Sequence, residues 1–136
     1  MRQWGPILTL VLAGWGAGCV DRLPDQDLRI RAEVPVAKMS PDDLWKDFQA
    51  DAAAARARYW GKAVEISGKP TKTEGQDSAG SYMLFVQSGE FGVRASLLDE
   101  DAPDLIARAA AGDRLTLKCY CEGLNGHVIL KSCVKP

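Results

Sequence analysis

Residues 59–68, with the sequence YWGKAVEISG, contain the change from helix to strand that decides the fold. Before Gly61, apolar residues recur at steps of three or four, which predicts an amphipathic helix. After Gly61 the period becomes two, because Val64 and Ile66 alternate with polar neighbours, and this predicts a strand. Gly68 lies inside that strand, where a glycine usually marks a bulge or a sharp bend. The chain is therefore expected to enter a bent first strand directly from a helix.

The helix before this junction is predicted to begin at Ser40 and to end at Gly61. Ser40 is a favourable N-cap residue, and Pro41 suits the first helical turn. The apolar face of this helix is formed by Leu44, Phe48, Ala52, Ala55 and Tyr59. One helix is thus expected ahead of the first strand.

Four further strands and a second helix are predicted after Gly68. The strands span residues 82–86, 91–97, 115–121 and 128–133, and the helix spans 101–111. Residues 74–80 are polar and are predicted to form a loop, and Asn125-Gly126 is a turn signal between the last two strands. This fold is mainly β with α, and its connectivity is that of a five-stranded OB-fold barrel with a helix between strands three and four. An open α+β sandwich with the same elements is the alternative.

Residues 1–18 have the features of a signal peptide. Arg2 is followed by an apolar run over residues 7–13, and small residues precede Cys19. This pattern is typical of a bacterial lipoprotein signal and predicts lipidation of Cys19. It places the protein in the cell envelope, facing the periplasm or the exterior, and Val20 favours the outer membrane. Because Gly16 stands where lipoprotein signals usually carry Leu, cleavage without lipidation is an alternative, as is an uncleaved membrane helix.

Residues 19–39 are predicted to be a flexible, lipid-anchored tether. Pro24 and Pro35 interrupt this stretch, its charges alternate, and it has no sustained apolar period. A flexible chain of this length would hold the domain about 25 Å from its anchor. An edge strand at Val34-Pro35-Val36 is the alternative interpretation. The OB-fold domain is then expected to span residues 40–136.

Several short motifs occur in a defined order along the predicted domain. They are Tyr59-Trp60-Gly61-Lys62, residues 64–68, Phe91-Gly92-Val93, Gly112-Asp113, Cys121-Glu122-Gly123 and residues 128–133. Over about residues 41–134, this ordered set resembles the tRNA_anti-like OB-fold family, whose members are commonly bacterial putative lipoproteins. The resemblance implies an OB barrel, and it brings no catalytic residues with it.

Three cysteines lie in the last two predicted strands. Cys119 and Cys121 share a face because side chains alternate along a strand, so either one is within reach of Cys133. Export permits a disulfide, and the family resemblance implies the pair Cys121–Cys133, which leaves Cys119 as a buried thiol. A metal site formed by these cysteines and His127 is an alternative, but Cys-x-Cys on a straight strand lacks the usual ligand spacing. We therefore predict no metal.

The sequence contains no nucleophile elbow, phosphate loop, dinucleotide fingerprint or zinc-protease motif. We predict a protein that is not an enzyme and needs no cofactor. The formal net charge is −1, which lacks the basic excess expected of a phosphate-backbone binder. Nucleic acid is therefore not the expected partner.

The expected binding surface follows from the predicted fold. OB folds commonly bind ligands across strands two and three, and the candidate residues there are Tyr82, Gln87, Arg94 and Ser96. In the alternative, Tyr82, Leu84 and Val86 fill the barrel. The sequence favours a membrane-tethered, extracytoplasmic OB-fold lipoprotein that acts as a non-catalytic binding or accessory module for an envelope protein or a glycan. A domain that binds single-stranded nucleic acid is the alternative function.

Overall fold

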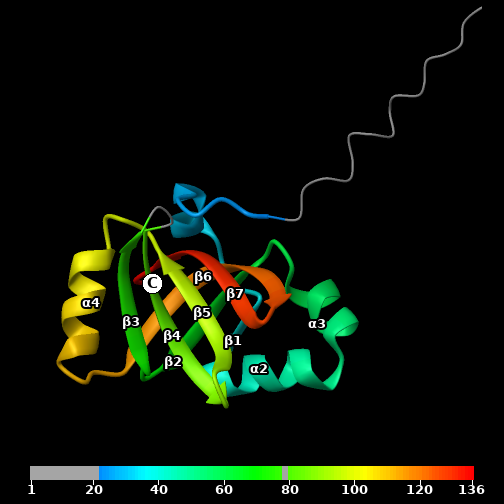
Figure 1. Ribbon diagram of the computed structural model, residues 1–136. Helices are drawn as coiled ribbons and strands as arrows, with labels where there is room; N and C mark the ends of the chain where they lie inside the picture. Colours follow the sequence, from blue (N-terminus) through cyan, green and yellow to red (C-terminus); the bar gives the residue numbers. More distant parts are fainter. Residues whose placement is uncertain (1–21, 78–79) are drawn as a thin grey trace, which may run out of the picture.

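The computed structural model describes residues 22–77 and 80–136. The predicted signal peptide and the lipidation of Cys19 lie outside these described residues. Figure 1 shows one curled sheet, with helices α2 and α3 at one side and helix α4 at the opposite side. None of the helices in the described part of the chain has the length and apolar character that a membrane span requires.

Seven strands form a single mixed sheet in the order β1-β2-β6-β7-β5-β4-β3. Their bounds are β1 (Ala37–Met39), β2 (Ala63–Gly68), β3 (Lys72–Asp77), β4 (Gly80–Ser88), β5 (Phe91–Leu97), β6 (Leu115–Asn125) and β7 (His127–Val134). The pairs β1–β2 and β5–β7 are parallel, and the other pairs are antiparallel. The described strands do not close into a barrel, so the prediction of a five-stranded barrel is corrected to an open, OB-like sheet of seven strands.

One of the two additional strands, β3, follows a break after the predicted first strand. The chain leaves β2 at Gly68, passes Pro70 and re-enters the sheet as β3, in a segment predicted as a loop. Pro70 has no backbone N–H to contribute to a strand ladder, which accounts for the interruption. Gly68 itself packs tightly, because a Cβ at this position would lie 2.8 Å from Cδ of Pro41. The predicted bend at Gly68 is therefore a break between two strands.

The described helices are the 3₁₀ helix η2 (Leu28–Ala32) and the α-helices α2 (Pro41–Ala50), α3 (Ala52–Tyr59) and α4 (Ala102–Ala110). As predicted, the Ser40 side chain caps α2, accepting the Asp43 N–H at 3.0 Å. The single predicted helix is divided at Asp51, whose backbone is extended and whose side chain caps α3 by accepting the Ala54 N–H at 3.1 Å. Helix α4 lies between β5 and β6, the place predicted for the second helix.

The first described residues pack against the sheet, which corrects the prediction of a flexible tether for this part of the chain. We call residues 22–33 the N-terminal clasp. Ile30 in η2 is fully buried in a cluster with Ala63, Leu98, Tyr120 and Val134. The adjoining β1 pairs with β2 just after the segment considered as an edge strand. The domain therefore begins well before residue 40.

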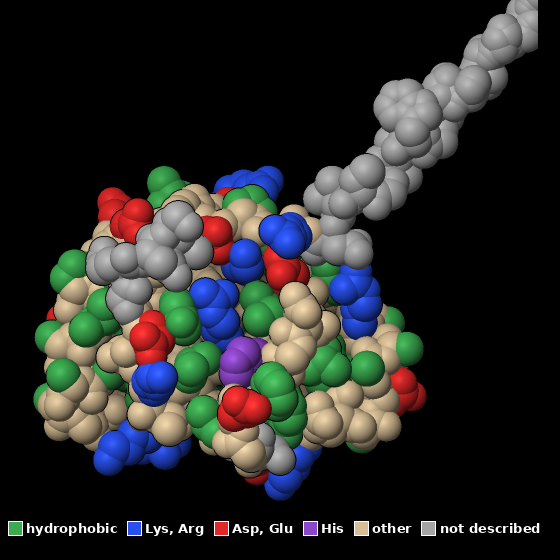
Figure 2. Space-filling view, viewed as in Figure 1, with side chains coloured by type: hydrophobic (Ala, Val, Ile, Leu, Met, Phe, Trp, Pro, Cys, Tyr) green, Lys and Arg blue, Asp and Glu red, His purple; other side chains and the backbone are tan. Residues whose placement is uncertain are grey.

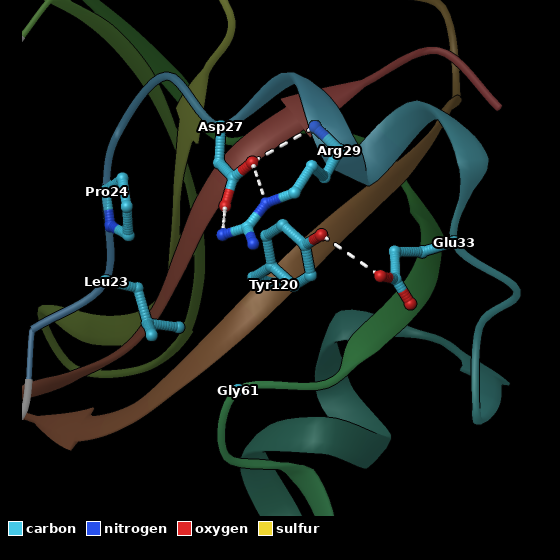
Figure 3. Close-up of a pocket in the computed structure, with 7 residues that line it drawn as sticks. All are labelled: Leu23, Pro24, Asp27, Arg29, Glu33, Gly61 and Tyr120. Atoms are coloured by element: carbon cyan, nitrogen blue, oxygen red, sulfur yellow. Dashed lines mark hydrogen bonds and ion pairs between the residues drawn. The ribbon is translucent and has the colours of Figure 1, made fainter.

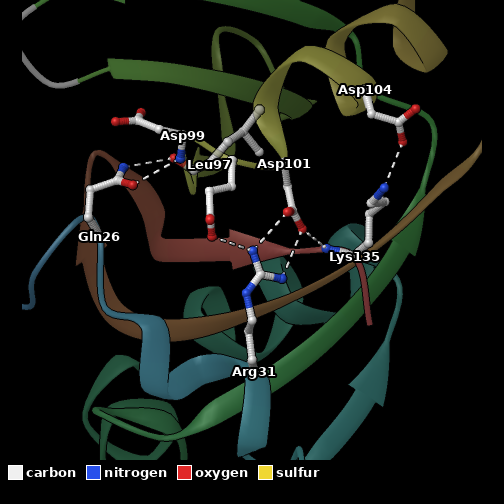
Figure 4. Close-up of polar contacts among 8 residues, drawn as sticks. Gln26, Arg31, Leu97, Asp99, Asp101, Asp104 and Lys135 are labelled. Atoms are coloured by element: carbon white, nitrogen blue, oxygen red, sulfur yellow. Dashed lines mark hydrogen bonds and ion pairs between the residues drawn. The ribbon is translucent and has the colours of Figure 1, made fainter.

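Polar contacts reinforce the N-terminal clasp (Figure 4). Arg31 binds the Asp101 carboxylate at 2.9 Å, and the Gln26 amide donates to the Leu97 carbonyl at 3.0 Å. The buried Lys118 ammonium donates to the carbonyls of Arg31 and Glu33 at 3.0 and 2.9 Å. Because these bonds satisfy backbone groups as well as charges, the clasp is an integral layer of the domain.

Candidate functional site

The strand register places three of the four predicted ligand-binding residues on one face of the sheet. Tyr82 pairs with Ser96, and Leu84 pairs with Arg94. Directly paired residues on antiparallel strands project to the same side. We call the side of β4 and β5 that carries Tyr82, Leu84, Arg94 and Ser96 the β4–β5 face. Figure 2 shows the molecule from the side on which β4 and β5 lie in front, with hydrophobic, basic and acidic side chains interspersed.

The opposite side of the same strands faces the core. Met83 and Phe85 are almost completely buried there, together with Val93 and Ala95. Because side chains alternate along a strand, Tyr82 cannot belong to the same buried row. The alternative in which Tyr82, Leu84 and Val86 fill the barrel is therefore wrong.

Arg94 is the central charged group of the β4–β5 face. Its guanidinium carbon lies 3.9 Å from the centroid of the Tyr82 ring, a cation–π contact worth about 0.5–1 kcal/mol. The neighbouring strand β3 carries Lys72 and Glu74, which pair with each other at 2.8 Å. Among the side chains that the structure describes, which exclude those of residues 75–79 and 88, no carboxylate forms an ion pair with Arg94.

The other two predicted residues differ from each other. Ser96 is 1% exposed, and its hydroxyl has no hydrogen-bond partner within the described structure. Gln87 lies at the bulge that ends the regular pairing of β4 and β5, and its amide donates to the Phe85 carbonyl at 3.3 Å. The structure thus brings Tyr82, Arg94 and Ser96 together and leaves Gln87 outside the row.

An aromatic pair borders this face at the start of β5 and β7. Phe91 is 44% exposed, and its ring meets the His127 ring edge-on at 5.4 Å. The Gly92 N–H donates to Nδ1 of His127 at 3.1 Å, which orients the imidazole. The sequence suggested His127 only as an alternative metal ligand and gave no link between it and Phe91. The parallel pairing of β5 with β7, which short-range patterns do not reveal, brings the two rings together.

A separate pocket of about 200 Å³ lies between the N-terminal clasp and β6 (Figure 3). It is lined by Leu23, Pro24, Asp27, Arg29, Glu33, Gly61 and Tyr120. Arg29 binds Asp27 at 2.7 Å, and the Tyr120 hydroxyl donates to Glu33 at 3.3 Å. Burial, and then the negative charge of Glu33, raise the pKa of Tyr120. Because its polar groups bind one another and its volume is below the usual range for ligand pockets, about 300–1,000 Å³, we assign no ligand to it.

The structure corrects the predicted disulfide. Cys133 is bonded to Cys119, with the two Cα atoms 4.3 Å apart, and the buried Cys121 is free. Lys118 pairs with Val134 and Cys121 with Leu130, so Cys119 stands opposite Cys133 and Cys121 is displaced along the strand. Burial raises the pKa of Cys121 to about 12. The disulfide also removes two thiols from the alternative metal site, and the described residues contain no other group suited to a metal ion.

A protein-family model, tRNA_anti-like, matches residues 1–134 of the chain. The chain belongs to the tRNA_anti-like family. Comparisons of this tRNA_anti-like protein with curated proteins and with solved structures give no match. Membership agrees with the OB-like arrangement, in which α4 connects β5 to β6. Since a fold does not determine a function, the role of this tRNA_anti-like domain must be argued from its surfaces.

Proposed function

We propose that this protein is a membrane-tethered, extracytoplasmic lipoprotein whose OB-like domain binds another envelope protein through the β4–β5 face, without catalysis. The observation that carries the proposal is the half-buried Arg94, which is held against Tyr82 on the β4–β5 face and has no carboxylate partner among the side chains that the structure describes. An acidic side chain of a partner can bind its guanidinium in the bidentate geometry that makes arginine–carboxylate pairs strong. The exposed Phe91 would add apolar contact at the edge of the same surface.

The proposed location rests on two independent features. The N-terminal sequence, from Arg2 through the apolar run to Cys19, is typical of a lipoprotein signal. The Cys119–Cys133 disulfide is of a kind that persists in oxidising compartments and is rare in the cytosol. Lipidation of Cys19 would hold the domain in the cell envelope, and Val20 favours the outer membrane.

Cross-linking in intact cells, followed by mass spectrometry of the captured proteins, tests the binding surface. The Arg94→Glu variant reverses the proposed contact, and Arg114→Glu is the control for the same charge change, because Arg114 is exposed and lies in the loop before β6. We expect a discrete partner with the wild type and with Arg114→Glu, and its loss with Arg94→Glu. Capture of the same partner by all three proteins would show that the β4–β5 face is not the binding surface.

Cell fractionation tests the tether separately. The Cys19→Ser variant should accumulate unprocessed or leave the membrane fraction. If it remains as membrane-bound and as fully processed as the wild type, the lipoprotein assignment is wrong.

Single-stranded nucleic acid is the alternative ligand, and the stacked Tyr82–Arg94 pair favours it. OB folds bind single strands by stacking bases on aromatic and arginine side chains. The predicted export and the net charge of −1 count against this alternative. A titration with single-stranded oligonucleotides distinguishes the two ligands. Micromolar affinity that falls steeply with salt and is lost in Arg94→Glu would identify nucleic acid, and not a protein, as the ligand of the β4–β5 face. Binding of isolated cell-wall glycan to the same face would instead identify a glycan ligand.

A further inference from the structure

A surface of exposed apolar and basic side chains lies where the described chain begins. Trp60 and Leu124 are 37% and 41% exposed. Arg22 and Arg56 line one hollow together with Leu124, and Arg56 lines a second, shallow hollow together with Trp60. Because Arg56 belongs to both hollows, these residues form one continuous surface. We call Arg22, Arg56, Trp60 and Leu124 the α3 patch.

The chemistry of the α3 patch suits the boundary between lipid and water. The Arg56 guanidinium lies 5.5 Å from the Trp60 ring, so a large aromatic ring and a positive charge are presented together. Tryptophan is enriched at membrane interfaces, and arginine is attracted to anionic headgroups while its stem covers apolar surface. Glu122 lines the same hollow: its backbone carbonyl accepts from Arg56 at 3.5 Å, and its carboxylate accepts the Leu23 N–H at 2.8 Å and lies 3.8 Å from Lys131.

The first described residues are fixed beside the α3 patch. The Leu23 N–H is bound to Glu122 on β6, and the Pro24 carbonyl accepts from the Ser132 hydroxyl at 2.9 Å. Cys19 is three residues before Arg22, and successive Cα atoms are 3.8 Å apart, so the two Cα atoms can be separated by at most about 11 Å. An anchor at Cys19 therefore brings the α3 patch to the membrane surface.

We propose that the α3 patch rests on the anionic headgroups of the membrane that holds the lipid anchor, and thereby fixes the orientation of the domain. This inference rests on the lipid anchor of the proposed function and adds a second membrane contact to it. The occupant is the bilayer because the short reach from Cys19 leaves the patch next to the membrane, and because its charge complements anionic lipid. Helix α4 then lies on the side of the sheet away from the membrane (Figure 1).

Site-specific photo-crosslinking of the full chain tests this orientation. Benzoylphenylalanine replaces Trp60 or Leu124 in two variants, and Ala107, which is exposed on α4, in a control variant. Each protein is purified from membranes, reconstituted into vesicles of phosphatidylglycerol and phosphatidylethanolamine, and irradiated. We expect phospholipid adducts at positions 60 and 124 and few at 107. Adducts should fall at least about fivefold in phosphatidylcholine vesicles, because each basic residue near an anionic surface contributes about that factor.

Two readouts separate the failure of this inference from the failure of the proposed function. Equal yields of lipid adducts at all three positions, or protein adducts at position 60 in intact cells in place of lipid adducts, would overturn the membrane contact. The mass of the N-terminal peptide reports the anchor independently. A lipidated chain without lipid adducts at 60 and 124 overturns this inference alone, whereas a chain without lipid on Cys19 overturns both.

Discussion

Replacing Ile30 with alanine tests whether the N-terminal clasp is part of the folded domain. Ile30 is fully buried against β6 and β7 neighbours, and Ile30→Ala removes three buried carbons. At about 0.8 kcal/mol for each, their transfer to water costs about 2.4 kcal/mol, and the cavity left behind raises the loss of unfolding free energy to about 3–4 kcal/mol. Had residues 19–39 been a flexible tether, the loss would be close to zero.

Urea unfolding of the oxidised protein, followed by circular dichroism, measures this loss. Leu28→Ala is the matched control, because Leu28 lies in the same 3₁₀ helix but is 59% exposed, and we expect a change within about 0.5 kcal/mol. The midpoint for Ile30→Ala should fall with little change in the denaturant slope, since the surface exposed on unfolding is nearly the same. An Ile30→Ala variant as stable as Leu28→Ala would refute the packing of the clasp.

Three further predictions concern the groups that hold the fold. Burial alone would raise the pKa of Asp101, but bonds from Arg31 and from the Lys135 N–H outweigh it and hold that pKa below its ordinary value of 3.8. The ionised carboxylate therefore stabilises the fold above about pH 4, and this contribution is lost as the pH falls through the folded-state pKa. Asp101→Asn should lower the free energy of unfolding by about 1–2 kcal/mol at pH 7. In acid-unfolding curves this difference from the wild type should vanish below the folded-state pKa. Glu100→Gln, at a 70% exposed position, should change the free energy of unfolding little. Since burial raises the pKa of Cys121 to about 12, Cys121 should resist maleimide at pH 8 until the protein is unfolded. Mass spectrometry of the non-reduced variants should show that Cys121→Ser keeps the disulfide and that Cys119→Ser loses it. Gly92→Ala should lower the urea midpoint by an amount equivalent to at least about 2 kcal/mol, because its Cβ would collide with the Phe85 carbonyl; an unchanged midpoint would show that the bulge can relax.

Local patterns predicted the parts of the fold that local chemistry determines. The Ser40 cap, the alternation around Val64 and the helix between β5 and β6 all follow from short-range signals. The division of the first helix at Asp51 depends on one residue whose side chain caps α3 while its backbone ends α2. An aspartate within a continuous apolar period gives no comparable signal, so pattern reasoning joined the two helices.

Register between distant strands decided the features that the sequence left open. Cys119 and Cys121 lie on the same face of β6, and the choice between them depends on the length of the β6–β7 turn and on the bulges that follow it. Asn125 pairs with His127, so Gly126 alone makes the turn, and two later register shifts between the strands cancel, so that counting back along both strands leaves Cys119 opposite Cys133. A two-residue Asn125-Gly126 turn would shift this count by one. The family resemblance could not replace that count.

The packed clasp changes what an anchor at Cys19 would do. A flexible stretch of twenty residues would let the domain turn freely about 25 Å from the membrane. With the chain bound to Glu122 and Ser132 from Leu23 onward, about three residues, which span at most about 11 Å, separate Cys19 from the described domain. The N-terminal clasp then loses its conformational entropy during folding, when Ile30 is buried, and not when a partner binds. A partner would therefore meet a β4–β5 face whose position relative to the membrane is already restricted, which favours binding to a neighbour in the same membrane.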